Sequence, residues 1–289
     1  MSQRDADRRK RIGSPDGPGT FEPMRAIPDS MDVAIVASID DRLSRLEVDD
    51  GVRIAWAIES GSRAWGFPSP DSDYDARFLY LRPAGDYLSP WPRRDVIETP
   101  LDKIFDVNGW DVAKALRLLV KGNGTVTEWL RSPIVYRGDP QFRDDLLTLA
   151  EQVTDRALLG RHYLHVGRRQ WADAQTASLK KVFYALRPAA ILRWLEQNPD
   201  RTVPPMDLPT ALAECDPPAG VVAATEDLIA VKAVAREIGR GTVPPPIARF
   251  VNEQYALAEL RYEDAERHDP AEAIARCEEF LRGLVGRLG

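Results

Sequence analysis

The spacing of apolar residues in the first half of the chain predicts a small unit of helices and strands. Apolar residues recur at helical intervals from Met31 to Leu46, and two apolar runs, at residues 52–59 and 75–82, have the length and composition of strands. A shorter β-prone run at residues 101–107 predicts a third strand, which we expect the sequence Asn-Gly to end. A further helix is predicted over Gly109–Lys121, with one apolar stripe formed by Trp110, Ala113, Leu116 and Val120.

Strand signals vanish after Gly138, and helical patterns interrupted by consecutive prolines take over. The predicted fold class is therefore α/β: a small mixed sheet with helices in residues 25–138, followed by a mostly helical domain in residues 139–289. Residues 1–24 combine a basic cluster with several Gly and Pro, a composition typical of a disordered leader.

Composition restricts the class of protein to an ordinary globular one. The 289 residues include 44% hydrophobic and 29% charged residues, and no uninterrupted apolar stretch approaches the ~20 residues that span a bilayer. The N-terminus lacks the apolar core of a signal peptide, and Cys215 and Cys277 lie far apart with no CxxC motif or nearby His. We therefore expect a cytoplasmic protein with reduced thiols, no zinc site and no membrane partner.

The segment AIESGSRAWGFPSPDSDYDARFLYL, from Ala57 to Leu81, contains the most informative polar residues. Gly61 and Ser62 follow one predicted strand, where a turn frees backbone N–H groups and a hydroxyl to hold phosphate oxygens. Asp73 and Asp75 lie at the start of the next strand, and residues two apart on a strand point to the same face. Paired carboxylates bind hard cations such as Mg²⁺. The pattern predicts a phosphate-binding turn beside a metal site, the minimum for metal-assisted nucleotidyl transfer.

Two structural interpretations compete with a metal site. The aspartates of Asp71–Asp75 imitate the start of a calcium-binding loop, but Ala76 stands where that loop needs Gly and Arg82 where it needs a bidentate Glu. Residues 68–72 are all turn formers, which is typical of a solvated turn. The order of the motif favours the metal site, because Gly-Ser ends one strand and the Asp pair opens the next. No P-loop or Gly-x-Gly-x-x-Gly sequence competes for the phosphate.

The run GSRAWGFPSPDSDYDARF, Gly61–Phe78, resembles the signature of the DNA polymerase beta superfamily, whose members carry Gly-Ser and then Asp-x-Asp. It is most similar to a bacterial and phage group of nucleotidyltransferases, some of which are associated with RNA ligases and RNA repair. Further similar segments are Phe105–Asn123, Glu128–Gly138 and Ser178–Leu195. The resemblance implies a minimal nucleotidyltransferase domain in residues 25–138, with the helical domain closing the nucleotide cleft and holding the acceptor.

The resemblance also implies a third carboxylate, on a strand next to the Asp pair. Asp102, Asp106 and Asp111 are the candidates. Asp102 and Asp106 share one face of the predicted strand, so alternation does not choose between them. Asp111 would lie in the first turn of the next helix, where an acid is favourable to the dipole without a catalytic role. We expect Asp106 to bind the catalytic metal and to help deprotonate the attacking hydroxyl, with Asp102 as the alternative.

Residues 155–196 are basic within an acidic chain. They contain eight Lys or Arg and three acids, a net charge of +5, whereas the whole chain carries −6 and its remainder therefore −11. Such a segment attracts a triphosphate or an RNA backbone. Tyr163, Trp171 and Tyr184 within it could stack on bases, although aromatic residues at helical spacing are more often buried.

The best-defined part of this segment is the helix predicted over residues 178–196. Four of its residues should face a core, Leu179, Phe183, Leu186 and Ala190, and Pro188 is expected to kink or interrupt it. Its resemblance to a Lys-Lys-x-Phe-Tyr-x-x-Arg-Pro pattern implies phosphate binding, and a solvated basic face is the alternative. Together with the Gly-Ser turn, the predicted nucleotide-binding set is Gly61, Ser62, Arg63, Lys181, Tyr184 and Arg187.

The resemblance and these residues together predict an enzyme that moves an NMP from an NTP to an acceptor hydroxyl. Two ions of Mg²⁺ or Mn²⁺ would be the cofactor and pyrophosphate the second product. The favoured acceptor is the 3′ end of RNA in repair or processing, bound through residues 155–196. NMP transfer to a protein or small molecule, as in antitoxin-like and antibiotic-modifying members of the superfamily, is one alternative. A non-catalytic RNA- or nucleotide-binding module is the other.

Overall fold

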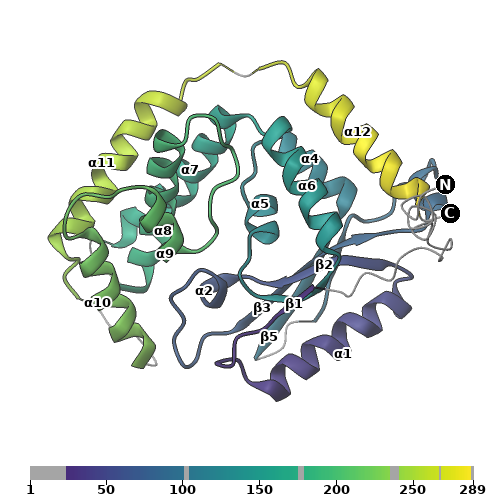
Figure 1. Ribbon diagram of the computed structural model, residues 1–289, viewed down its shortest axis with the longest axis horizontal. Helices are drawn as coiled ribbons and strands as arrows, with labels where there is room; N and C mark the ends of the chain where they lie inside the picture. The colour runs from purple at the N-terminus through teal and green to yellow at the C-terminus, as the bar shows by residue number, and fades with distance from the viewer. Residues whose placement is uncertain (1–23, 101–103, 175–178, 235–240, 267, 288–289) are drawn as a thin grey trace, which may run out of the picture.

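The computed structural model describes residues 24–100, 104–174, 179–234, 241–266 and 268–287. It shows a mixed sheet with helices on both faces and a cluster of helices beside it (Figure 1), which confirms the predicted α/β class. Of the predicted leader, residues 1–23 lie outside the described residues, and Met24 is the first residue of a strand. No helix in the described ranges has the length and hydropathy needed to cross a membrane.

In the described part of the chain, six strands form one sheet in the order β1-β6-β2-β3-β5-β4. Their bounds are Met24–Ala26 (β1), Arg53–Glu59 (β2), Tyr74–Leu81 (β3), Val96–Glu98 (β4), Phe105–Asp111 (β5) and Val135–Gly138 (β6). β3 and β5 pair in parallel, and the other neighbouring pairs are antiparallel. Two short helices, α2 (Gly61–Ala64) and α3 (Ala84–Tyr87), precede and follow β3.

One face of the sheet is covered by α1 (Val33–Asp49), the helix predicted from the first apolar period (Figure 1). The Asp32 carboxylate caps it, because it accepts hydrogen bonds from the first backbone N–H groups of the helix. Val36, Ile39 and Leu43 form its buried stripe and pack with apolar residues of β2 and β3.

The other face is covered by α4 (Val112–Val120), α5 (Thr125–Leu130), α6 (Pro140–Val153) and α12 (Ala271–Gly286). Their apolar residues form one core with β2 and β3. α12 is far from the sheet in sequence, yet it packs on α4 and α6 (Figure 1). The core of the sheet therefore extends past the boundary predicted at residue 138 and includes α6 and α12.

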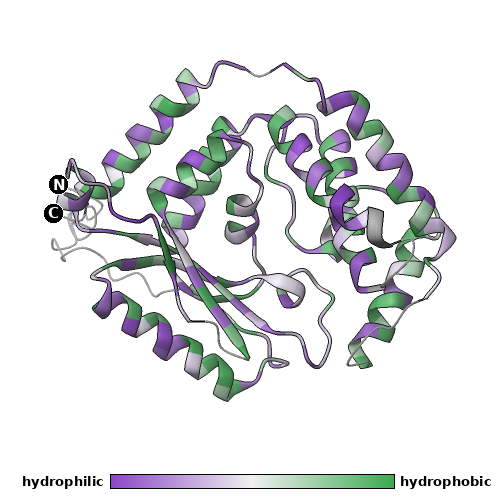
Figure 2. Ribbon diagram, turned by 180° about the vertical axis from the view of Figure 1, so that it is seen from behind, coloured by the Kyte–Doolittle hydropathy of each residue, from purple (hydrophilic) through white to green (hydrophobic). Residues whose placement is uncertain are grey.

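The helical cluster contains α7 (Arg156–Ala174), α8 (Leu179–Gln197), α9 (Leu208–Glu214), α10 (Val221–Val234) and α11 (Pro245–Tyr262). α8 lies inside it, and Phe183, Leu186 and Ala190 are buried as predicted. α8 continues through Pro188, so the predicted interruption is absent. Contacts with α7, α9 and α11 hold the helix in place on several sides. In Figure 2 the outer helices α1 and α12 carry both hydrophobic and hydrophilic residues along their length.

β5 ends later in the chain than predicted, since the sequence Asn-Gly does not end it and the following helix begins only at Val112. A Cβ atom on Gly109 would lie 2.2 Å from Cε2 of Phe78, so the strand needs glycine where the Phe78 ring packs. Asp111 is the N-cap of α4 and accepts a hydrogen bond from Ala113 N at 2.8 Å. The prediction that Trp110 belongs to the helix was wrong, because it lies on β5.

Candidate active site

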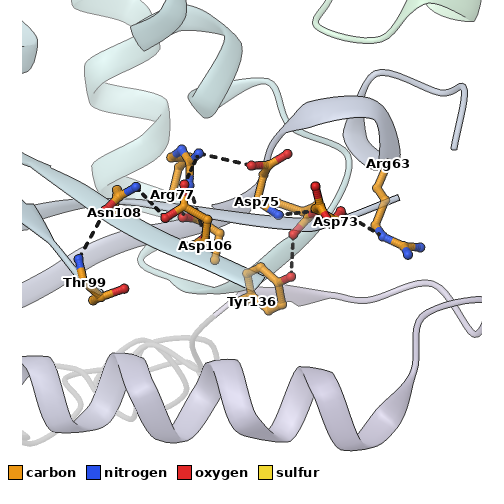
Figure 3. A network of polar contacts seen from close by, with 10 residues as sticks. Arg63, Asp73, Asp75, Arg77, Thr99, Asp106, Asn108 and Tyr136 are labelled. Carbon is orange, nitrogen blue, oxygen red and sulfur yellow. Dashed lines mark hydrogen bonds and ion pairs between the residues drawn. The ribbon is translucent and has the colours of Figure 1, made fainter. Parts of the chain in front are cut away.

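Asp75 on β3 and Asp106 on β5 lie side by side because the two strands pair in parallel at these positions (Figure 3). Between their carboxylates lies the guanidinium of Arg77. Its Nη2 donates to Asp75 Oδ1 at 3.2 Å and to Asp106 Oδ2 at 2.9 Å. Asn108 Nδ2 donates to the other oxygen of Asp106 at 2.7 Å. Two predicted site residues thus form one polar network with two that were not predicted.

Asp73 lies just before β3 and is exposed to solvent. Its backbone carbonyl accepts a hydrogen bond from Arg63 Nε at 3.3 Å (Figure 3). Burial raises the pKa of Asp75, the Arg77 guanidinium opposes this rise, and the charges of Asp106 and Asp73 add to it. The other two predicted carboxylates, Asp73 and Asp106, therefore lie close enough to Asp75 to influence its ionisation.

The Gly-Ser turn lies directly against Asp75. Gly61 has a φ of +63°, and a Cβ atom there would lie 2.1 Å from Asp75 Oδ2. Glycine alone satisfies both the backbone angle and the close approach. The N–H of the preceding residue, Ser60, donates to the Asp75 carbonyl at 2.8 Å. The contact between the turn and the Asp75 carboxylate therefore requires glycine at this position of the motif.

The connector between the turn and the Asp pair folds back on Ser62. The Ser62 hydroxyl donates to Ser72 Oγ at 2.8 Å, and Ser72 Oγ also lies 3.0 Å from Ser69 Oγ. Arg63 Nη2 donates to the Ser72 carbonyl at 2.6 Å. These bonds place Ser62 and Arg63 beside the segment that carries Asp73, and their binding of phosphate stays a prediction.

The donor chemistry of Asp75 and Asp106 fits a cation. One oxygen from each carboxylate already contacts a single positively charged nitrogen of Arg77, so both can approach one cationic centre. Carboxylate oxygens are the ligands that Mg²⁺ prefers in proteins. In the described ranges no three His, Cys, Asp or Glu side chains converge in this way, so Asp73 stands apart from the pair.

One family model covers most of the sequence that builds these contacts. The model of the RNA repair pathway DNA polymerase beta family matches residues 35–282. The chain belongs to this family. Among curated proteins, the uncharacterized protein YcgL of Bacillus subtilis (strain 168) is 42% identical over 179 residues, which are 61% of this chain and 68% of YcgL. The resemblance inferred from the Gly-Ser and Asp-x-Asp motifs is confirmed, and the family supports a polymerase-beta-like nucleotidyltransferase in RNA repair.

In this polymerase-beta-family chain, Tyr184 on α8 lies close enough to Asp75 and Asp73 for their charges to affect the pKa of its hydroxyl. Burial raises the pKa of its hydroxyl, and so do the charges of Asp75 and Asp73, whereas Arg187 lowers it. Lys181 is half-buried near the start of the same helix. Tyr184 and Lys181 both belong to the predicted nucleotide-binding set, and phosphate binding by either residue stays a prediction.

Arg187, which was predicted to bind phosphate, is buried among the helices. It is 6% exposed, and its Nη1 donates to Glu128 Oε1 at 2.8 Å and to the Met206 carbonyl at 3.3 Å. The same Glu128 oxygen accepts a hydrogen bond from the Tyr163 hydroxyl at 3.0 Å. The guanidinium also lies 4.5 Å from the ring of Trp65, which follows α2. A buried arginine needs a carboxylate partner of this kind. Through its contact with Trp65, Arg187 packs against the end of the turn that carries Gly61 and Ser62.

The structure corrects the predicted base-stacking surface. Tyr163 and Trp171 are 1% and 6% exposed, and the Trp171 indole donates to Asn252 Oδ1 at 2.7 Å. Of the three aromatic residues, only Tyr184 stays partly exposed. Arginines of the basic segment are also engaged within the chain, with carboxylates or backbone carbonyls, as seen for Arg156, Arg161, Arg168, Arg187 and Arg193.

Glu59, at the end of β2, is a site residue that was not predicted. It is fully buried, its Oε1 accepts a hydrogen bond from Asp75 N at 2.9 Å, and its Oε2 accepts one from the Tyr136 hydroxyl at 2.5 Å (Figure 3 shows Tyr136). Burial raises the pKa of Glu59 to about 7, and both hydrogen bonds oppose this rise. The available signal was an acid at the end of an apolar run, two residues before the Gly-Ser turn.

An open cavity of about 1800 Å³ lies elsewhere, among α4, the start of α7 and α12. Its lining includes Leu116, Leu158 and Leu281 together with Arg156 and Arg276. No predicted site residue lines it. The candidate site is therefore the end of β3 and β5 at which Asp75 and Asp106 meet.

Proposed function

We propose that this chain is a metal-dependent nucleotidyltransferase that moves an NMP from an NTP to the 3′ hydroxyl of RNA and releases pyrophosphate. The observation that carries the proposal is the approach of Asp75 and Asp106 to one cationic centre, with Gly61 packed against Asp75. Membership of the RNA repair pathway DNA polymerase beta family supports RNA as the substrate class.

In this proposal Asp73 and Asp75 would hold two Mg²⁺ or Mn²⁺ ions, and Asp106 would complete the site of one of them. When bound, the ions neutralise charge on the phosphates and lower the pKa of the attacking hydroxyl. Asp106 accepts the proton of that hydroxyl. The oxygen then forms a bond to the α-phosphorus while the bond from the α-phosphorus to the pyrophosphate oxygen breaks. Arg77 balances the charge of Asp75 and Asp106 before the ions bind.

The NTP would be bound from two sides, by Gly61, Ser62 and Arg63 of the turn and by Lys181 and Tyr184 of α8. The influence of Asp75 and Asp73 on the Tyr184 hydroxyl supports this placement of α8. Arg187 contributes by packing behind the turn, on Trp65. Positioning and charge neutralisation supply most of the rate in such a mechanism.

The test is incubation of the full chain with each α-labelled NTP, Mg²⁺ or Mn²⁺, and short RNA and DNA primers. We expect stepwise extension of RNA by the wild type, loss of extension on chelation of the metal, and loss in Asp73→Ala. The matched control is Asp71→Ala, which removes an exposed carboxylate from the same connector and should keep activity. Full metal-dependent activity in Asp73→Ala would show that the site assignment is wrong.

One observation favours a different acceptor. Because many arginines of residues 155–196 are engaged within the chain, this segment offers less charge to RNA than its sequence suggests. Transfer of the label to protein, or release of pyrophosphate without primer extension, would indicate that the acceptor is a protein or a small molecule. Tight RNA binding without any transfer would instead identify a binding module.

A further inference from the structure

Lys232 on α10 is a buried lysine that the proposed chemistry does not use. It is 3% exposed, and its ammonium donates to the backbone carbonyl of Phe67 at 2.6 Å. The nitrogen also lies 4.7 Å from the centre of the Phe67 ring and 5.5 Å from that of Phe183. Burial lowers the pKa of Lys232 to about 8, the charge of Lys180 acts in the same direction, and Asp71 opposes both. No Asp or Glu among the described residues forms an ion pair with it.

A buried ammonium of this kind is costly to keep. Removing its charge from water is unfavourable, and one backbone carbonyl with two aromatic rings compensates only part of that cost. A Met of similar length would fill the same space between Phe67 and Phe183 without this penalty. The presence of lysine here therefore indicates a role for the charge itself.

The carbonyl that Lys232 holds belongs to the connector between the Gly-Ser turn and Asp73. Phe67 is fully buried, and its ring stacks on Phe183 at 4.8 Å. Its N–H donates to the Ser62 carbonyl at 3.1 Å. Phe67 is thus bonded to the turn through its N–H and to α10 through its carbonyl. This is a direct link from the helical cluster to the predicted phosphate-binding turn.

We infer that Lys232 is a positioning residue for nucleotide binding. Its ammonium holds the Phe67 carbonyl, and through Phe67 it keeps Ser62 in the conformation that receives the phosphates of an NTP. This inference rests on the proposed function, because it names how the helical cluster prepares the same site.

The test compares Lys232→Met, which keeps the length of the side chain, with Lys232→Arg, which keeps a charged donor. The full chain is titrated with ATP and Mg²⁺ by calorimetry, and KM and kcat are measured separately. We expect Lys232→Met to weaken ATP binding about tenfold, equivalent to about 1.4 kcal/mol, with kcat changed by less than about threefold. Lys232→Arg should restore most of the affinity. Lys121→Met is the control, since it removes an exposed lysine far from the connector in sequence.

A second readout is independent of activity. Amide hydrogen exchange in peptides covering residues 61–72 should be faster in Lys232→Met than in wild type, because the connector loses its bond to α10. If Lys232→Met does not fold, Lys232→Gln replaces it, with the same expected loss of affinity. Wild-type affinity and unchanged exchange in the variant would overturn the inference, as would a loss in kcat with KM unchanged. Failure of the wild type to bind any NTP would instead refute the proposed function, and the inference with it.

Discussion

Replacing Gly61 by Ala tests the contact between the Gly-Ser turn and Asp75. The new Cβ would lie 2.1 Å from Asp75 Oδ2, whereas Cβ atoms essentially never approach another heavy atom more closely than 3.0 Å. The carboxylate must therefore shift by about 1 Å, a misplacement that costs about 100-fold in rate at a catalytic group. The φ of +63° adds about 1–2 kcal/mol of backbone strain for any residue with a Cβ atom.

Gly51→Ala separates these two effects. Gly51 has nearly the same φ, +61°, but a Cβ atom there would meet nothing within 4 Å. Both variants should lose about 1–2 kcal/mol of unfolding free energy from the backbone, which lowers the melting temperature by a few degrees. Only Gly61→Ala should lose activity.

The assay is single-turnover NMP transfer at saturating NTP and metal, beside thermal unfolding followed by circular dichroism. We expect Gly61→Ala to be at least about 100-fold slower than Gly51→Ala. Rates within about threefold of each other would refute the reasoning, because the clash with Asp75 would then have no consequence for the chemistry.

Three further predictions concern charged residues around the site. Arg187→Met leaves the Glu128 carboxylate buried without its partner and should lower the unfolding free energy by about 3–5 kcal/mol. In urea unfolding, the double variant with Glu128→Leu should recover part of this loss. No recovery would contradict the pairing. Arg77→Met removes the positive charge between Asp75 and Asp106. Thermal unfolding should show that the variant is less stable than wild type in chelator and gains more stability from Mg²⁺. Equal gains in stability would count against a cation site. Glu59, whose pKa is raised from 4.5 to about 7, contributes stability that is fully present below pH 4.5 and is lost as pH rises to about 7. Urea titrations should show this fall in wild type and a flatter profile in Glu59→Gln, and identical profiles would exclude Glu59 as its cause.

The part of the site that lies in one segment could be predicted from the sequence. Gly61, Ser62 and Asp75 are close in the chain, and Asp75 lies in the predicted strand. Asp73 lies just before β3, so strand alternation does not fix the direction of its side chain. The expectation that Asp106 lies beside Asp75 also agrees with the register of β3 and β5. Asp102 lies outside the described residues.

Contacts between distant residues could not be predicted in the same way. The bond from Lys232 to Phe67 joins residues 165 positions apart in the chain, and no local pattern signals it. Arg187 was predicted to bind phosphate from a sequence pattern, and such a pattern shows only which residues follow one another along a helix. It does not show that helices surround α8, so that Arg187 is buried against Glu128. The end of β5 was missed because Gly109 is a turn signal in sequence, whereas here it admits the Phe78 ring.

The position of α12 has a consequence for how the protein folds during translation and for how it can be truncated. The core of the sheet combines α4 and α6 with Cys277 and Leu284 of α12, so it needs sequence from both ends of the described chain. A ribosome delivers α7–α11 before it delivers α12, and the layer over the sheet is completed last. A fragment ending at Gly138 would lack α6 and α12 and leave apolar surface on α4 uncovered. The carboxylates therefore cannot be isolated on a minimal domain by truncation alone, and deletions from the C-terminal side should affect the sheet before they affect the helical cluster.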